Sequence, residues 1–276
     1  MKTRAGFTLV EVMIALSLTA IIGAAVTGVF VTQSGYFDHQ EKMSFARGVS
    51  RGATNIMVSE LRMLERSNGL VSASNRHITV LAPYAMGVSC GPSGGKLIVS
   101  QVPADTMMTG AAGFSGYAYR TGAGAYVYVS STTAPTSGAG SVCTNVRVRS
   151  LPADSGGRVV ALSPSSAAAP GAPVLLYQRL TYEFKNSVQV PGRIALWRRI
   201  EDLDSPRDEE LVAPFDTSAG FRFFVNDAPT PVSTVPGTLS TVSGVQLILD
   251  GLNERPAADG SLTRVPMKTS VFFKNR

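Results

Sequence analysis

The chain has 276 residues, of which 44% are hydrophobic and 16% are charged, and its formal net charge is +6. This length exceeds the usual size of one domain and fits one globular domain with a long additional element. The hydrophobic fraction is sufficient to bury a sizeable core, which excludes a chain that is disordered throughout. Loss of Lys2 and Arg4 with a leader would lower the net charge by two, to +4, so the positive charge is only a weak indication of anionic partners.

A long apolar run begins at Phe7 and extends to Val31, with Glu11 as its single ionisable residue. At about 1.5 Å per residue it can cross a hydrocarbon core about 30 Å thick, so residues 7–31 are predicted to form a transmembrane helix. The basic leader predicts that this end stays in the cytoplasm and that the rest of the chain lies on the other side. A secretory signal has a shorter apolar core and is cut after it. Here Gly6 precedes the apolar run, so cleavage after Gly6 would leave the helix in the protein.

The sequence Gly-Phe-Thr-Leu-Val-Glu at residues 6–11, between the basic leader and the apolar run, resembles the N-terminus of type IV pilins and of type II secretion pseudopilins. The resemblance implies that prepilin peptidase requires Gly6 and removes residues 1–6, and that Phe7 becomes the N-methylated terminus. A carboxylate at membrane depth costs about 2.5–3.5 kcal/mol on insertion scales, so Glu11 is expected to have a functional partner. In the pilin family this partner is the terminal amine of a neighbouring subunit. The alternative is that Glu11 only extends to the lipid head groups.

The helical pattern continues beyond the membrane segment. Apolar residues recur at spacings of three and four, most charged residues take other positions, and no proline occurs before Pro83. The pattern predicts one helix from about Phe7 to Arg66, about 90 Å long, in which residues 32–66 form an amphipathic continuation. Asn68 and Gly69 are the predicted stop residues. The apolar residues of the continuation are Phe45, Val49, Ala53, Ile56, Met57, Leu61 and Leu64.

Residues 67–276 contain many short strand-like segments and are predicted to form a β-rich globular domain. No helical pattern separates the later strands, so the sheet should be mostly antiparallel, with its apolar face against the outer half of the long helix. The predicted class is α+β, with the architecture of a type IV pilin. Two stretches rich in Gly, Ser, Ala and Pro, residues 131–141 and 163–173, are predicted to be exposed loops. The predicted strands are His77 to Leu81, Lys96 to Val102, Ala125 to Ser130, Asn145 to Arg149, Pro173 to Phe184, Arg193 to Ile200, Gly220 to Val225, Val242 to Leu249, and Met267 to Phe273.

A second, weaker resemblance lies in the C-terminal part of the chain, between residues 173 and 276. The segments VLLYQRLTYEF, ALWRRIED, DEELVAPFDTSAGFRFFV, VSGVQLIL and TSVFFKNR are similar in order and spacing to PilW-type minor pilins and to pseudopilin J. Residues 70–172 carry no such resemblance.

The two resemblances imply a structural, non-enzymatic subunit without a cofactor. It would cross the bacterial inner membrane once, with its C-terminal domain in the periplasm, and then enter a pilus or pseudopilus. Its implied partners are other minor pilins, the major pilin, the inner-membrane assembly platform and prepilin peptidase. The preferred interpretation is a minor pilin that acts in initiation or in the tip complex of a type IV pilus. The alternatives are a type II secretion subunit like pseudopilin J, and a tip adhesin or DNA-uptake receptor whose function resides in residues 70–172.

The chain has two cysteines, Cys90 and Cys143, both in the part expected outside the cytoplasm. Such a pair in an oxidising compartment is compatible with one disulfide. The alternative is two unpaired buried thiols, because the sequence does not show whether their Cα atoms come close enough.

Three sequence patterns suggest catalysis or metal binding only superficially. Residues 87–91 fit the G-x-S-x-G pattern of serine hydrolases, but no helix-forming segment follows and both histidines precede it. Residues 94–96, Gly-Gly-Lys, lack the hydroxyl residue of a phosphate-binding loop and are predicted to form a turn. His39 and His77 are 38 positions apart and lack the neighbouring cysteines of a zinc site. No enzymatic activity is therefore predicted.

Two charged clusters are candidates for ligand binding. Asp202, Asp204 and Asp208 lie in an acidic run that could bind Ca²⁺, but the run lacks the spacing of an EF-hand and a solvated acidic loop is preferred. A basic and aromatic surface could contact DNA, although arginines that alternate on strands more often form a solvent-exposed face. That surface would consist of Arg147, Arg149, Trp197, Arg198 and Arg199.

Overall fold

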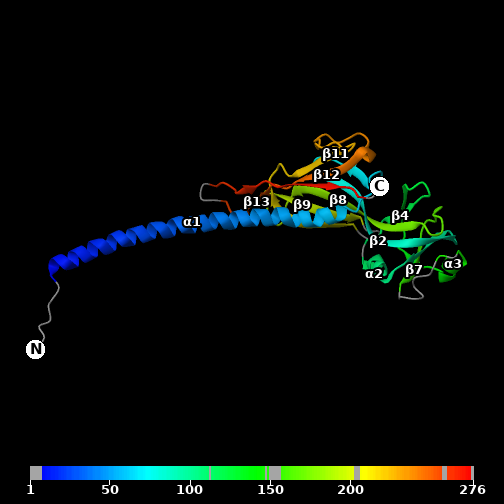
Figure 1. The fold of residues 1–276 in the computed structure, drawn as a ribbon, viewed down its shortest axis with the longest axis horizontal. Coiled ribbons are helices and arrows are strands. Elements are labelled where there is room, and N and C mark those ends of the chain that lie inside the picture. The colour runs from blue at the N-terminus through cyan, green and yellow to red at the C-terminus, as the bar shows by residue number, and fades with distance from the viewer. Residues whose placement is uncertain are drawn as a thin grey trace, which may run out of the picture.

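The computed structural model of the chain describes residues 8–111, 113–146, 148, 157–201, 206–256 and 260–274. A single long helix, α1 (Leu9–Leu61), projects far out of a β-rich globular part (Figure 1). Thr8 is the N-cap of this helix. Its hydroxyl accepts a hydrogen bond from the backbone amide of Glu11, and the Glu11 carboxylate accepts one from the Thr8 amide. This reciprocal capping box fixes the start of the helix, because it satisfies amide groups that have no partner inside the helix.

The two halves of α1 have different surroundings. Residues 8–41 are exposed on all sides, and the helix is long and apolar enough to cross a membrane by its length and composition. From Ala46 onward one side of the helix is buried against the sheet, as its three- and four-residue spacing predicts. Each fully buried leucine or methionine on this side contributes about 1.5–3 kcal/mol to stability. The buried residues are Ala46, Val49, Ser50, Ala53, Met57 and Leu61.

The helix ends at Leu61 and not at the predicted Arg66. The backbone amides of Met63 and Leu64 reach back three residues instead of four, so the last turn tightens. The buried carboxylate of Glu65 then accepts hydrogen bonds from the amides of Ser67, at 2.9 Å, and Asn68, at 2.8 Å. A side chain that holds the backbone of the next residues favours a turn over a further helical turn.

The described strands form two sheets in which every pairing is antiparallel. The larger has the order β14-β13-β10-β9-β8-β2-β3-β7-β6, with β1 beside β2 and the β4–β5 hairpin beside β8; the smaller has the order β11-β12-β15. The predicted α+β fold, a long helix on an antiparallel sheet, is confirmed. The strands are β1 (Leu70–Ala73), β2 (His77–Ser93), β3 (Lys96–Gln101), β4 (Gly116–Arg120), β5 (Tyr126–Ser130), β6 (Thr136–Ser137), β7 (Arg158–Leu162), β8 (Pro173–Asn186), β9 (Ile194–Glu201), β10 (Arg207–Phe215), β11 (Gly220–Val225), β12 (Val242–Ile248), β13 (Gly251–Leu252), β14 (Arg264–Val265) and β15 (Lys268–Phe272).

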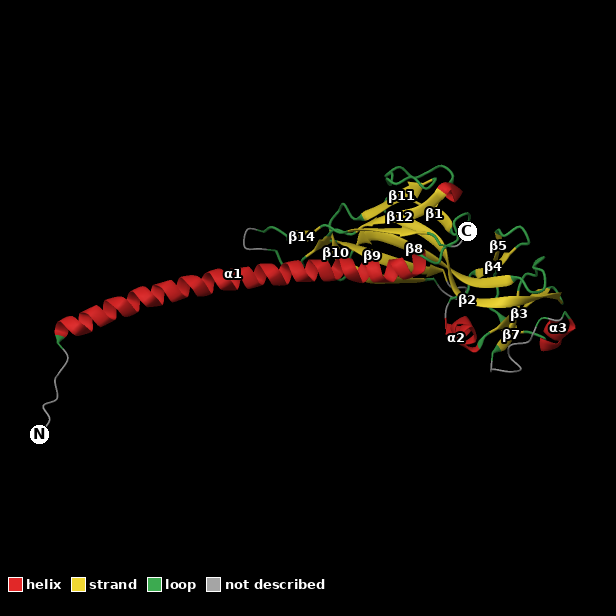
Figure 2. Cartoon of the chain, in the orientation of Figure 1, coloured by secondary structure: helices red, strands yellow, loops and turns green. Residues whose placement is uncertain are grey.

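The globular part contains two main hydrophobic cores that share two long strands. The first core joins the buried side of α1 to both sheets. The second lies in what we call the distal lobe, residues 84–176, which also carries the short helices α2 (Pro103–Ala111) and α3 (Gly140–Asn145). Figure 2 shows this lobe at the end of the molecule farthest from the N-terminus of α1. Strands β2 and β8 run through both regions, so the distal lobe is attached by continuous sheet. The second core contains Leu97, Val99, Phe114, Tyr117, Leu162, Val174 and Leu176.

Several predicted elements differ from the structure. The strand predicted at residues 145–149 is wrong at its start, because Asn145 ends helix α3; Arg147 and Arg149 lie outside the described residues. The exposed loop predicted at residues 131–141 contains β6 and the first residues of α3. The alternation of apolar and polar residues does not predict seven of the described strands, which are β1, β4, β6, β7, β10, β13 and β14. Strand β2 is also much longer than predicted, with 17 residues.

The largest correction concerns the acidic run. Its second half, with Asp208, is not a solvated loop but the start of strand β10. There Asp208 lies opposite Arg199 of β9, and Glu209 lies opposite Arg198. Opposite charges on paired strands stabilise the sheet, so these acidic residues serve strand pairing.

Candidate functional site

The N-terminal end of α1 carries Glu11, the candidate assembly residue; Gly6 and Phe7 lie outside the described residues. One carboxylate oxygen, Oε2, accepts hydrogen bonds from the amide and the hydroxyl of Thr8, both at 2.9 Å. The other oxygen, Oε1, makes no hydrogen bond within the described chain. A carboxylate can accept about four hydrogen bonds, so capacity remains for a donor from another molecule. Exposed apolar side chains, among them Val12 and Leu16, surround Glu11 on the helix.

Cys90 and Cys143 form the predicted disulfide, which is confirmed by a Cα–Cα distance of 4.6 Å. The bond joins β2 to α3 inside the distal lobe, and neither cysteine is exposed. Ile98 and Ala161 of neighbouring strands pack around it. The disulfide therefore fixes a short helix of the lobe to its sheet.

The patterns that resemble catalytic sites have structural roles. Ser89, at the centre of the G-x-S-x-G pattern, is buried in strand β2; its hydroxyl donates to the carbonyl of Ala168 and accepts from the amide of Gly91. Gly94 and Gly95 adopt positive φ angles of 58° and 74° in the turn between β2 and β3, as predicted for a turn.

The acidic candidates for calcium are not brought together by the described part of the chain. Asp202 and Asp204 lie outside the described residues, and Asp208 lies on strand β10. Among the described residues no group of three or more His, Cys, Asp or Glu could hold a metal ion. Two neighbours of Asp208 have other partners, since Glu209 pairs with Arg198 at 2.8 Å and Glu210 accepts from the amide of Val188.

The described residues considered for DNA contact, Trp197, Arg198 and Arg199, are divided between two faces of the sheet. Arg198 points toward α1, where it pairs with Glu60 at 3.1 Å, whereas Trp197 and Arg199 point to the opposite face. The indole of Trp197 lies under the ammonium group of Lys185, 4.7 Å from the ring centroid. Acidic residues alternate with the basic ones on that face, which is unlike the single positive sign that a nucleic-acid surface requires.

A polar cluster that sequence patterns did not reveal connects α1 to the sheet. Glu60 accepts hydrogen bonds from the phenol of Tyr182 and from Arg198, and Arg198 also pairs with Glu209. Burial and the negative charge of Glu60 raise the pKa of Tyr182, so the phenol remains a proton donor. Glu60 and Tyr182 are 122 positions apart, a pairing that no local pattern contains. The cluster fixes the rotation of α1 on the sheet.

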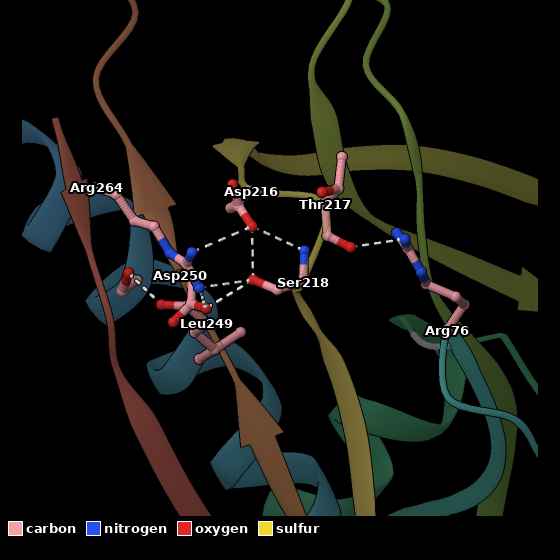
Figure 3. A network of polar contacts seen from close by, with 8 residues as sticks. Arg76, Asp216, Thr217, Ser218, Leu249, Asp250 and Arg264 are labelled. Carbon is pink, nitrogen blue, oxygen red and sulfur yellow. Dashed lines mark hydrogen bonds and ion pairs between the residues drawn. The ribbon is translucent and has the colours of Figure 1, made fainter. Parts of the chain in front are cut away.

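A second polar cluster, which we call the base cluster, consists of Asp216, Ser218, Asp250 and Arg264 (Figure 3). The Ser218 hydroxyl lies 2.6 Å from Asp216 Oδ1 and 2.7 Å from Asp250 Oδ2, and Arg264 contacts both carboxylates. The hydrogen bond from this hydroxyl is the largest of several contacts that lower the pKa of Asp216. Asp250 is only 3% exposed and therefore depends on Arg264 for its compensating charge.

The turn after β12, which contains Asp250 of the base cluster, is in close contact with α1. Ser50 of the helix donates a hydrogen bond of 2.8 Å to the carbonyl of Leu249, which directly precedes Asp250. The next residue, Gly251, lies so close to the carbonyl of Ala46 that a Cβ atom would not fit. The alternation of apolar and polar residues in the sequence does not predict this close approach of two backbones. The presence of Gly251 gives only a weak indication of it.

Comparison with protein families matches residues 1–27 to the prokaryotic N-terminal methylation motif. Comparisons with curated proteins and with solved structures gave no match. Pilin-like proteins that carry this motif are structural and non-enzymatic, and prepilin peptidase processes them. The motif and the exposed apolar half of α1 are those of a prepilin anchored in the inner membrane before it enters a filament. The chain is therefore a type IV pilin-like or pseudopilin-like subunit.

Proposed function

We propose that the chain is a minor pilin of the PilW type that acts in initiation or in the tip complex of a type IV pilus. Prepilin peptidase cuts between Gly6 and Phe7, the new terminus is methylated at Phe7, and the globular part lies in the periplasm before assembly. Glu11 then receives the terminal amine of a neighbouring subunit. Its partners are the other minor pilins, the major pilin and the inner-membrane assembly platform.

The observation that carries this proposal is the combination of the N-terminal methylation motif with a helix half that is exposed on every side. In the membrane this apolar surface contacts lipid, and in a filament it contacts the same surface of other subunits. When the helix leaves the bilayer, each Å² of apolar surface that becomes exposed to water costs about 25 cal/mol of free energy. This cost is avoided where other helices cover the surface. Extraction is therefore favourable only into an assembly of such helices.

The distal lobe favours a minor over a major subunit. It adds about ninety residues at the end farthest from the membrane anchor, with its own core and disulfide. A shaft is built from many identical subunits with closely spaced axes, so a bulky lobe on each subunit is unfavourable. A subunit present in few copies near the tip has no such restriction.

Processing is tested by replacing Gly6 with leucine in the native bacterium. The expected result is a protein that keeps residues 1–6 and fails to enter pili, because the peptidase requires a small residue before the cut. Mass spectrometry of the purified subunit gives the terminus directly. The control is Ala5→Leu, which enlarges the neighbouring leader residue and should leave a methylated Phe7.

The choice between pilus and secretion system is tested by deleting the gene. A strain without this subunit should lose most surface pili, counted by electron microscopy, and should secrete its type II substrates normally. Loss of secretion with normal piliation would instead support a subunit like pseudopilin J.

A further inference from the structure

Strand β5 lies on a free edge of the larger sheet in the distal lobe, because among the described strands it pairs with β4 alone. Figure 2 shows β4 and β5 on one side of the lobe and α3 on the other, at the end of the molecule opposite the N-terminus of α1. Val127 is 39% exposed and Ser130 is also exposed, so solvent reaches this strand. Another molecule can therefore approach the edge without meeting the exposed half of α1.

The backbone of β5 presents unpaired hydrogen-bonding groups along this edge. On the inner side, the Thr121 amide donates to the Ala125 carbonyl at 2.8 Å, and the Ser131 amide donates to the Ser115 carbonyl at 3.1 Å. In an antiparallel pair, residues that bond to the neighbouring strand alternate with residues that do not, so the odd-numbered residues of β5 bond to β4. The even-numbered residues point their amides and carbonyls outward, and no group of the described chain bonds to them. These outward residues are Tyr126, Tyr128 and Ser130.

The edge of β5 lacks the usual protection against pairing with another chain. Native proteins protect such edges with charges, prolines or a covering segment. In this molecule β10 carries three consecutive acidic residues and a proline, and the edge of β11 is closed by a backbone pairing of Phe223 with Val232. By contrast, residues 121–134, which include β5, contain no charged residue and no proline. The first four residues of β5 are aromatic or β-branched, so the composition favours addition of a further strand.

The edge of β5 is complementary to itself. When two copies meet antiparallel about a twofold axis at Tyr128, this residue lies opposite its own copy and Tyr126 lies opposite Ser130. All outward amides and carbonyls then bond across the contact, because the same positions face outward on both strands. On the other face of the sheet Val127 lies opposite Val129, an apolar pair of the kind that stabilises antiparallel strands. No like charges face each other across this contact.

We propose that β5 is a self-association surface, through which two copies of this chain pair edge to edge and extend the sheet across both distal lobes. This inference does not depend on the proposed role in pilus assembly, because β5 belongs to the globular part. The hairpin is already fixed beside β8 within one molecule, so little conformational entropy is lost on pairing. The contact is small compared with a permanent interface, and the association should be reversible.

The test is disulfide cross-linking of the full chain in detergent micelles, with two variants that each carry one added cysteine, Val127→Cys and Val129→Cys. The native cysteines do not compete, because Cys90 and Cys143 are buried and bonded to each other. In the proposed register, residues 127 and 129 of the two copies form a non-hydrogen-bonded pair with Cα atoms about 4.5 Å apart, within the range of about 4.4–6.8 Å for disulfides. A mixture of the two variants should therefore form a covalent dimer under mild oxidation. Each variant alone should form much less, since its two added cysteines lie on a diagonal about 7–8 Å apart.

A proline at position 130 tests the backbone pairing itself. Ser130→Pro removes one outward amide from each copy, so the cross-linking yield of the mixed variants should fall about tenfold. The matched control is Ser130→Ala, which loses the same hydroxyl but keeps the amide and should retain the yield. The melting temperatures of the two variants should be similar, because the amide of residue 130 has no partner within the described chain. The proposal is overturned if the mixture gives no more dimer than either cysteine variant alone, or if the proline and alanine variants cross-link equally.

Discussion

At the scale of single residues, the side chains that fix α1 on the sheet are polar and come from distant parts of the sequence. Glu60, Tyr182 and Arg198 meet between the helix and the sheet. The carboxylate of Glu60 accepts hydrogen bonds from both of the others, and the charge of Arg198 compensates its own. The sequence predicted the apolar residues around them correctly, because apolar spacing repeats locally. It could not predict the polar contacts, because these depend on how the strands are ordered.

Removing the phenol of Tyr182 tests this cluster. Tyr182→Phe keeps the ring and takes away the hydrogen bond to the carboxylate of Glu60, so the free energy of unfolding should fall by about 1.5–3 kcal/mol, the value for bonds to charged groups. The matched control is Tyr177→Phe, which loses a bond to a neutral carbonyl and should cost about 0.5–1.5 kcal/mol. Denaturant unfolding of the full chain in micelles, followed by the fluorescence of Trp197, measures both. Equal losses in the two variants would contradict the assigned role of Glu60.

At the scale of elements, the helices and strands with a regular apolar pattern were predicted well, and those without such a pattern were predicted poorly. The long helix, the antiparallel sheet and the disulfide were expected and are confirmed. Strand β10 was missed because its first residues are charged, and their partners on β9 become visible only once the strands are paired. The end of α1 was misplaced because the side chain of Glu65 turns the backbone before the glycine does.

The disulfide should stabilise the distal lobe more than the rest of the molecule. Cys90 and Cys143 are 53 positions apart, and closing such a loop stabilises the folded state by about 4 kcal/mol in the chain-entropy model. Replacing both with alanine should therefore speed hydrogen exchange in β3 and β7 strongly and leave the core around α1 nearly unchanged. Exchange measured by mass spectrometry distinguishes the two regions. Uniform loss of protection would show that the two cores unfold as one unit.

At the scale of the whole molecule, the chain consists of a bare helix half, a helix half covered by sheet, and a lobe at the far end (Figure 1). The first two parts could be predicted from the sequence, because membrane length and helical spacing are directly visible in it. The distal lobe could not, since the strands that lie wholly within it have only two to six residues. Among the described residues, the first half of α1 is exposed on all sides, so substitutions there can change assembly without disturbing the globular core.

The last prediction concerns Glu11, which in this proposal pairs with the terminal amine of the subunit above it. Glu11→Ala should leave membrane insertion and the globular fold intact, because within the described chain the carboxylate contacts only Thr8. It should weaken association with the other minor pilins at least about tenfold, since an amine left unpaired in an apolar medium costs several kcal/mol.

Thr8→Ala provides the control: it breaks the capping box, at a cost of about 0.5–2 kcal/mol, but keeps the carboxylate. Co-purification from solubilised membranes should thus lose partners with Glu11→Ala and retain them with Thr8→Ala. Equal recovery of partners with both variants would contradict the pairing, and with it the placement of this subunit beneath another one in the filament.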